Sequence, residues 1–190
     1  MRSINGDLKK LSEGYVVCSC EGAAEEAVMN ILLNNGCLIF DRDSLGDRKV
    51  TRKRKAVDIQ QEFLNRDFSP CKVNIVRILD SRREKFKLGK LYEKRFPVYT
   101  FRTTPEIEML LIIGENKDKT YRQQYKTNIK PSEYCQTVLK LGSGIKSSDF
   151  WYKYFADVNN LLNVLLKYHG SRSDKNEYGI YDLLKDEYKK

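Results

Sequence analysis

The chain has 190 residues, of which 41% are hydrophobic and 32% charged, and its 35 Lys and Arg against 26 Asp and Glu give a formal net charge of +9. This composition excludes a disordered chain, and no apolar run approaches the ~20 residues that a membrane-spanning helix needs. The positive charge favours polyanionic partners, nucleic acid first, although a basic surface without a partner is the simpler alternative.

The apolar pattern predicts strands and helices in alternation along the first part of the chain. Strands are expected at residues 14–20, 37–40, 72–79 and 97–102, which are short runs rich in apolar residues. Helices are expected at residues 23–32, 56–64, 81–95 and 105–113, the last with Pro105 at its first position. A loop at 41–47 and a basic run at 48–55 interrupt this order.

The second part of the chain is predicted to be helical and basic. A polar stretch at 114–130 precedes a helix opened by Pro131, and apolar residues at helical spacing predict a further helix across 150–165. We therefore expect an α/β fold. A mainly parallel four-stranded sheet flanked by helices would occupy residues 1–113, and residues 114–190 would form a helical, basic extension that packs on this core.

The cysteines and the N-terminal sequence indicate the cellular setting. Five cysteines without a Cys-x-x-Cys pair argue against a disulfide framework or a zinc site. Residues 1–10 lack the apolar region of a secretory signal, so we expect a cytoplasmic protein with no membrane partner. The absence of a Gly-x-x-x-x-Gly-Lys-Ser/Thr loop argues against ATP hydrolysis by this chain alone.

Two acidic residues directly follow predicted strands. Glu21 follows the first strand and Asp80 the third. Because functional side chains collect at the carboxyl ends of parallel strands, we expect these two carboxylates to lie at the same edge of the sheet. Such a pair can hold Mg²⁺, which takes one or two carboxylates and keeps several waters. The alternative is that each acid only complements the N-terminus of the helix that follows it.

Two segments resemble a known family. The run Val16-Val17-Cys18-Ser19-Cys20-Glu21-Gly22-Ala23-Ala24-Glu25-Glu26 resembles the first motif of Toprim domains, in which a strand ends in Glu-Gly before a helix. The run Thr104-Pro105-Glu106-Ile107-Glu108-Met109-Leu110-Leu111-Ile112 resembles the Pro-x-Phe-Glu-x-Trp-Leu-Leu segment of RloB-like and related abortive-infection proteins, which are Toprim-like chains of prokaryotic phage-defence loci. Together the similarities span about residues 14–113, and Glu108 takes the place of the family's glutamate.

The resemblance implies a nuclease that depends on Mg²⁺, with Mn²⁺ as the alternative cation. Its metal ligands would be Glu21 and Asp80, and its catalytic residues Glu21, Asp80 and Glu108. The family carries Asp-x-Asp at the third strand, whereas here Arg82 stands at the position of the second acid. Either Glu108 or Glu84 compensates, or the fold carries no nuclease chemistry.

A second Asp-x-Asp is present at Asp41 and Asp43, and it resembles the corresponding motif of primase-type Toprim domains. The strand before it is short and its spacing from Glu21 is tight. We therefore rank this pair behind Asp80 for the metal site.

The basic residues form two clusters near the predicted site. The first is expected to follow a nucleic-acid backbone and consists of Arg48, Lys49, Arg52, Lys53, Arg54 and Lys55. Arg82 and Arg83 come just after Asp80 and would contact phosphate. The alternative for both clusters is a solvated surface.

These observations lead to two main hypotheses. The first is a Toprim-like protein that binds DNA or RNA and cuts it with Mg²⁺, as a component of a prokaryotic defence or mobile-element system. The second is a catalytically inactive Toprim-like module that binds nucleic acid or docks on a partner ATPase. A plain interaction protein, charged only for solubility, is a third option.

Overall fold

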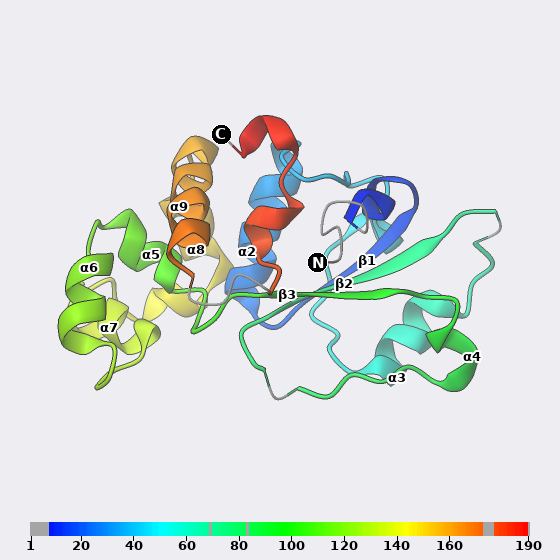
Figure 1. Cartoon of the computed structure of the whole chain (residues 1–190), viewed down its shortest axis with the longest axis horizontal. Helices are drawn as coiled ribbons and strands as arrows, with labels where there is room; N and C mark the ends of the chain where they lie inside the picture. The colour runs from blue at the N-terminus through cyan, green and yellow to red at the C-terminus, as the bar shows by residue number, and fades with distance from the viewer. Residues whose placement is uncertain (1–7, 69, 83, 173–176, 190) are drawn as a thin grey trace.

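A parallel sheet forms the centre of the molecule, and in the described residues it has three strands in the order β1-β2-β3 (Figure 1). The computed structural model describes residues 8–68, 70–82, 84–172 and 177–189. The strands are β1 Tyr15–Cys20, β2 Val73–Leu79 and β3 Val98–Arg102. Cys20 lies opposite Ile78, and Ile78 lies opposite Phe101, so the three carboxyl ends meet at one edge.

Helices surround this sheet. The α-helices are α2 Ala23–Asn34, α3 Ala56–Ile59, α4 Lys90–Glu93, α5 Met109–Gly114, α6 Asp118–Thr120, α7 Pro131–Thr137, α8 Ser148–Tyr154 and α9 Val158–Ser171. Two π-helical turns, η3 Gln60–Leu64 and η4 Tyr121–Tyr125, continue α3 and α6. The 3-10 helices are η1 Lys9–Ser12, η2 Gly46–Arg48, η5 Ser143–Lys146, η6 Ile180–Leu183 and η7 Asp186–Tyr188. None of the helices in these residues has the length and apolar character that crossing a bilayer requires.

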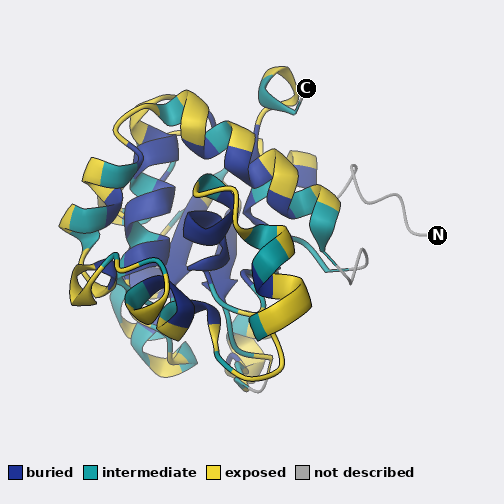
Figure 2. Cartoon of the chain, turned by 90° about the vertical axis from the view of Figure 1, so that its left-hand side faces the viewer, coloured by how far each residue is buried: buried dark blue, intermediate teal, exposed yellow. Residues whose placement is uncertain are grey.

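The sheet has a hydrophobic layer on each face because side chains alternate along a strand. Val16, Cys18 and Cys20 of β1 face a large core built with α2, α5, α8 and α9. Val17 and its neighbours on β2 face a smaller core built with α3, η3 and the residues around α4. Every residue of β2 is buried, as expected for the central strand of a sheet covered on both faces (Figure 2).

The mixed α/β architecture agrees with the sequence-based expectation, but the predicted strand at 37–40 does not join the sheet. Leu38 instead makes an isolated antiparallel bridge to Leu184. The backbone groups around it bond to the C-terminal segment, since the Ile39 N–H donates to Leu183 O (2.9 Å) and the Lys185 N–H donates to Cys37 O (2.9 Å). The outer side of β1 is taken by single bridges to Leu45 and Thr51 rather than by a strand.

The predicted helix at 81–95 is wrong for most of its length. Within residues 81–88, those that the structure describes are not helical, and α4 covers only Lys90–Glu93. Two side chains of this stretch are drawn toward a buried arginine of β2 instead. Glu84 forms an ion pair with Arg77, and the Arg77 guanidinium lies 4.1 Å from the centre of the Phe86 ring. A tertiary contact therefore overrides the local helical pattern.

Two further helix boundaries differ from the expectation. The helix expected from Pro105 begins at Met109, and residues 106–108 form a turn in which Glu106 accepts a hydrogen bond from the Ser132 N–H (2.8 Å). The helix expected across 150–165 is divided into α8 and α9. The Asp157 side chain caps the second of these by accepting a hydrogen bond from the Asn159 N–H (2.9 Å). The helix opened by Pro131 is confirmed.

Residues on both sides of the predicted boundary at 113 and 114 share the large core. Helix α2 packs against α8, and α5 packs against α9. The C-terminal segment also contributes, because Leu183 and Leu184 are fully buried in the same cluster. The division into 1–113 and 114–190 as separate units stays a prediction.

Leu184→Ala should show that the C-terminal segment completes the core. The substitution removes a fully buried side chain, and it should lower the free energy of unfolding by about 2–5 kcal/mol through lost transfer energy and the cavity left behind. Urea denaturation followed by circular dichroism measures this loss. Leu91→Ala is the control, since Leu91 is 83% exposed, and its effect should stay within about 0.5 kcal/mol. Equal, small effects at the two positions would contradict the prediction.

Candidate functional site

The ends of β1 and β2 are joined through one side chain, the carboxylate of Glu21. Its Oε2 atom accepts hydrogen bonds from the backbone N–H groups of Asp80 (2.9 Å) and Ser81 (3.2 Å). The parallel register that sets Cys20 opposite Ile78 produces this contact, because the next residues along both strands then meet. The structure thus places Glu21 and Asp80 side by side at the carboxyl edge of the sheet.

Gly22 and Glu25 lie at the beginning of α2, directly after Glu21. Gly22 is the N-cap residue, and a Cβ atom at this position would lie 3.0 Å from Glu25 Oε2. The glycine therefore leaves room for the Glu25 carboxyl group, which folds back over the first turn of its own helix. Glu25 is only 4% exposed, and sequence reasoning did not single it out.

Asp80 lies close enough to Glu21, Glu106 and Glu108 for their charges to act on it, and Glu25 is affected by Asp80, Glu108 and Glu21 in the same way. We call these five carboxyl groups the acid cluster: Glu21, Glu25, Asp80, Glu106 and Glu108. Burial, followed by a hydrogen bond to Glu21 and the negative charge of that group, raises the pKa of Asp80 well above its ordinary value. The pKa of Glu21 is lowered despite burial, by hydrogen bonds from the Asp80 side chain and from two backbone N–H groups. Of the two carboxyl groups, Asp80 therefore binds a proton more readily than Glu21 does.

Glu108 belongs to the same cluster but has its own counter-ion. Its carboxylate is 5% exposed and forms an ion pair with Lys146 Nζ at 2.8 Å. Lys146 comes from η5, and the negative charges of Glu106 and Glu25 also act on its ammonium group. Sequence reasoning missed Lys146, because nothing local marks a lysine that lies 38 residues beyond its partner.

On its other side, Glu21 begins a chain of alternating charges. Its Oε1 atom pairs with Arg54 Nη2 at 3.1 Å. Arg54 Nε donates a hydrogen bond to Glu84 Oε2 at 2.9 Å, and Glu84 also pairs with Arg77. We call Glu21, Arg54, Glu84 and Arg77 the charge chain. It connects the acid cluster with an arginine that is 2% exposed in the middle of β2.

The predicted basic run is divided by the structure into two parts. Arg48 and Lys49 lie in an exposed turn, where Arg48 has φ of +53° and pairs with Asp43 (3.4 Å). The four residues from 52 to 55 and Asp58 line an open hollow of about 450 Å³. Three of these four carry an acidic partner: Arg52 with Glu26 (3.3 Å), Lys53 with Glu62 (2.9 Å) and Arg54 as described above.

The second Asp-x-Asp is not part of the acid cluster. Asp41 Oδ1 accepts hydrogen bonds from Ser44, from its N–H at 2.8 Å and its Oγ at 2.6 Å. The Ser44 carbonyl in turn accepts the N–H of Val16, at the amino end of β1. Five residues of strand, or ~16 Å, separate that point from Glu21. Asp80, not Asp41 or Asp43, is therefore the acid that the fold brings to Glu21.

The cluster after Asp80 is described in part. Arg82 is exposed and forms an ion pair with Glu177 at 2.9 Å, which ties this loop to the C-terminal segment. Arg83, the other predicted phosphate contact, lies outside the described residues.

The donor chemistry of Glu21 and Asp80 suits a hard cation such as Mg²⁺ or Mn²⁺, since both supply carboxylate oxygens. In the residues that the structure describes, no three His, Cys, Asp or Glu side chains are arranged as they stand to hold a metal ion. Both oxygens of Glu21 already accept protein donors. A cation at Glu21 would thus have to compete with the Arg54 guanidinium, the positive charge that the fold itself provides there.

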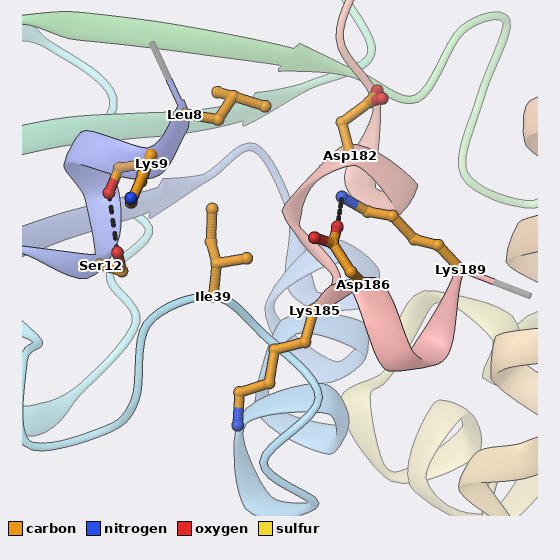
Figure 3. Close-up of a pocket in the computed structure, with 8 residues that line it drawn as sticks. All are labelled: Leu8, Lys9, Ser12, Ile39, Asp182, Lys185, Asp186 and Lys189. Carbon is orange, nitrogen blue, oxygen red and sulfur yellow. Dashed lines mark hydrogen bonds and ion pairs between the residues drawn. The ribbon is translucent and has the colours of Figure 1, made fainter. Parts of the chain in front are cut away.

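A separate hollow of about 540 Å³ lies between η1 and the C-terminal helices η6 and η7 (Figure 3). Three of its charged side chains have partners, because Lys189 lies 3.5 Å from Asp186 and Asp182 accepts the Gly179 N–H at 2.7 Å. None of the described residues predicted for the site lines this hollow. It is thus distinct from the acid cluster.

Comparison with known proteins gives no relative of this chain: no family model, no curated protein and no solved structure matches it.

The stability of the metal-free protein should depend on Glu25 in a pH-dependent way. Burial, reinforced by the negative charges of its acidic neighbours, raises the pKa of Glu25 from 4.5 to about 7. A carboxyl group whose pKa is higher in the folded state favours folding at low pH, and this contribution is lost as pH rises through the folded pKa.

Glu25→Gln should therefore increase the free energy of unfolding at about pH 8, by up to about 3 kcal/mol, and have little effect at about pH 4. Urea denaturation in EDTA at the two pH values measures the difference between variant and wild type. A difference that is the same at both pH values would contradict the high pKa.

Proposed function

We propose that the chain is a Toprim-like nucleic-acid-binding protein that hydrolyses phosphodiester bonds with Mg²⁺ or Mn²⁺. The observation that carries this proposal is the meeting of the Glu21 and Asp80 carboxyl groups on adjacent parallel strands, inside a cluster of further acids. The similarity of the segments around Glu21 and Glu108 to Toprim and RloB-like proteins supports it. On this proposal the three-stranded sheet is the Toprim-like core, and the setting is a prokaryotic defence or mobile-element system in the cytoplasm.

Glu21 and Asp80 would hold the cation, which when bound polarises a phosphoryl group or activates water. The chain's own residues supply the rest. Glu21 is oriented by two backbone N–H groups, so its carboxylate is fixed before any ligand arrives. Asp80, whose pKa is raised in the metal-free protein, would have to be deprotonated to serve as a ligand. Glu108 forms an ion pair with Lys146 beside these two groups.

Basic side chains near the cluster would contact the nucleic acid. The hollow lined by residues 52–55 adjoins Glu21 through Arg54. Arg82 lies two residues after Asp80 and is half exposed. Lysine and arginine at such positions neutralise phosphates and make binding salt-dependent. All five cysteines are free thiols, which agrees with a reduced compartment.

A specific observation favours the catalytically inactive alternative. Arg54 already neutralises Glu21, and Arg82 stands where the resembling family has a second acid. In this alternative the charge chain replaces the cation and stabilises the sheet edge, and the protein binds nucleic acid or a partner ATPase without cleavage. The two functions differ in whether a divalent cation binds at all.

Glu21→Gln should abolish cation-dependent cleavage and leave nucleic-acid binding nearly unchanged. The amide keeps the shape of the side chain but removes the charge that a hard cation needs. Asp80→Asn should behave in the same way. Cleavage of plasmid, single-stranded DNA and RNA is measured with Mg²⁺ and with Mn²⁺, and calorimetry measures cation binding.

Asp43→Asn is the matched control, because Asp43 lies outside the acid cluster and should leave cleavage intact. The nuclease proposal fails if the wild-type protein neither binds Mn²⁺ nor cuts any substrate. Arg82→Asp then tests the decayed site, in which the added carboxylate should strengthen Mn²⁺ binding.

Neutralising the hollow should weaken nucleic-acid binding in a salt-dependent way. The triple change of Arg52, Lys53 and Lys55 to Gln removes three charges that line it, and the slope of log affinity against log salt should flatten by roughly three. Fluorescence anisotropy with labelled oligonucleotides over a range of salt measures this slope. The control changes Lys117, Lys119 and Lys126 to Gln, around α6 and η4. Equal slopes for the two triple variants would mean that the hollow does not face nucleic acid.

A further inference from the structure

Arg54 has a geometry that leaves part of its guanidinium group unused. Nε donates to Glu84, and Nη2 lies between Glu84 and Glu21. Within the part of the chain that the structure describes, Nη1 has no hydrogen-bond or ion-pair partner. A guanidinium group carries five N–H donors in a fixed fork, so two donors on Nη1 stay available. The side chain is 41% exposed and lines the basic hollow.

Glu84 is held in its place from the interior of the protein. Its other carboxylate oxygen pairs with Arg77, whose side chain is buried in β2 and covered by the Phe86 ring. A buried guanidinium needs a counter-ion, because an unpaired charge in the interior is strongly destabilising. In the described residues, Glu84 is the only carboxylate that forms an ion pair with Arg77. The Nε atom of Arg77 is itself buried without a hydrogen-bond partner. Because Arg77 needs a counter-ion, it fixes the position of the Glu84 carboxylate, and this carboxylate in turn orients Arg54.

We infer that Arg54 is the residue of this site that contacts a nucleic-acid phosphate through Nη1, and that Glu84, anchored by Arg77, is its positioning residue. This inference rests on the nucleic-acid binding proposed above. Glu84 and Glu21 hold one side of the fork, which turns the other side toward the hollow. Without Glu84, the guanidinium group has Glu21 as its remaining partner and folds onto that carboxylate, away from the phosphate.

The inference predicts that Glu84→Gln weakens nucleic-acid binding, whereas the loss of a negative charge alone would strengthen it. Removing a negative charge beside a basic hollow should strengthen binding of a polyanion, and Asp58→Asn is the matched control for this, because Asp58 lines the same hollow. Glu84→Gln removes the same charge, yet it should weaken binding by at least about threefold and reduce the salt slope by about one, the loss of one phosphate contact. Labelled single-stranded and duplex oligonucleotides of DNA and RNA are the probes, in EDTA, so that no cleavage contributes.

A double variant of Arg54 and Glu84 shows whether Glu84 acts on binding through Arg54 or independently of it. In the Arg54→Gln background, Glu84→Gln should no longer weaken binding, since the two residues act as a unit. Arg54→Lys keeps the charge but lacks the fork, and it should bind as weakly as Arg54→Gln. This variant also keeps the inference testable if Glu84→Gln fails to fold, which thermal unfolding reports.

Three results would overturn the inference. Glu84→Gln could strengthen binding as Asp58→Asn does, or weaken it equally in the Arg54→Gln background, or Arg54→Lys could bind like the wild type. In each case nucleic-acid binding itself would stand, and so would the proposed function. If the wild-type protein binds none of the probes at low salt, the proposed function and the inference fail together.

Discussion

The geometry of the whole site depends on one contact, the acceptance of two backbone N–H groups of the β2 end by the Glu21 carboxylate. A side chain from one strand thereby terminates its neighbour, where the sheet hydrogen bonds stop and the N–H groups would otherwise lack partners. The contact fixes the loop after β2 and with it Asp80. It also lowers the pKa of Glu21, whereas the pKa of the neighbouring Asp80 is raised. The Glu21 carboxylate therefore both holds the end of β2 and belongs to the proposed metal site.

The buried arginine of β2 is the second constraint. Arg77 lies opposite Ser19 in the sheet and is surrounded by apolar side chains of the smaller core. Burial lowers its pKa, and Glu84 opposes that effect. Replacing a buried ion pair by hydrophobic residues of similar volume is often neutral or stabilising, so the pair itself is weak evidence for stability. What the arginine does provide is a fixed direction for the loop after β2, because Glu84 must reach inward to meet it.

The sequence was informative where the signal is local. The runs at 14–20 and 72–79 are rich in apolar residues, so the strands and the acids that follow them, Glu21 and Asp80, could be predicted from position alone. The stretch at 81–95 could not be predicted correctly, because nothing in its own sequence shows that the buried Arg77 draws Glu84 inward. The run at 37–40 is apolar as expected, yet its partner is the C-terminal segment rather than the sheet. Glu25 and Lys146 acquire their roles only through packing.

The C-terminal segment closes the fold over a long sequence distance. Tyr178 bridges to Phe101 of β3, and Leu184 bridges to Leu38 after α2. Together with an all-parallel sheet, such pairings raise the mean separation of contacting residues, and chains dominated by non-local contacts fold slowly because the loops must close before the contacts form. The large core is complete only when residues 178–184 are docked, and in a chain where they are not, the apolar residues that they contact, among them Leu38 and Phe101, would be open to association with other chains.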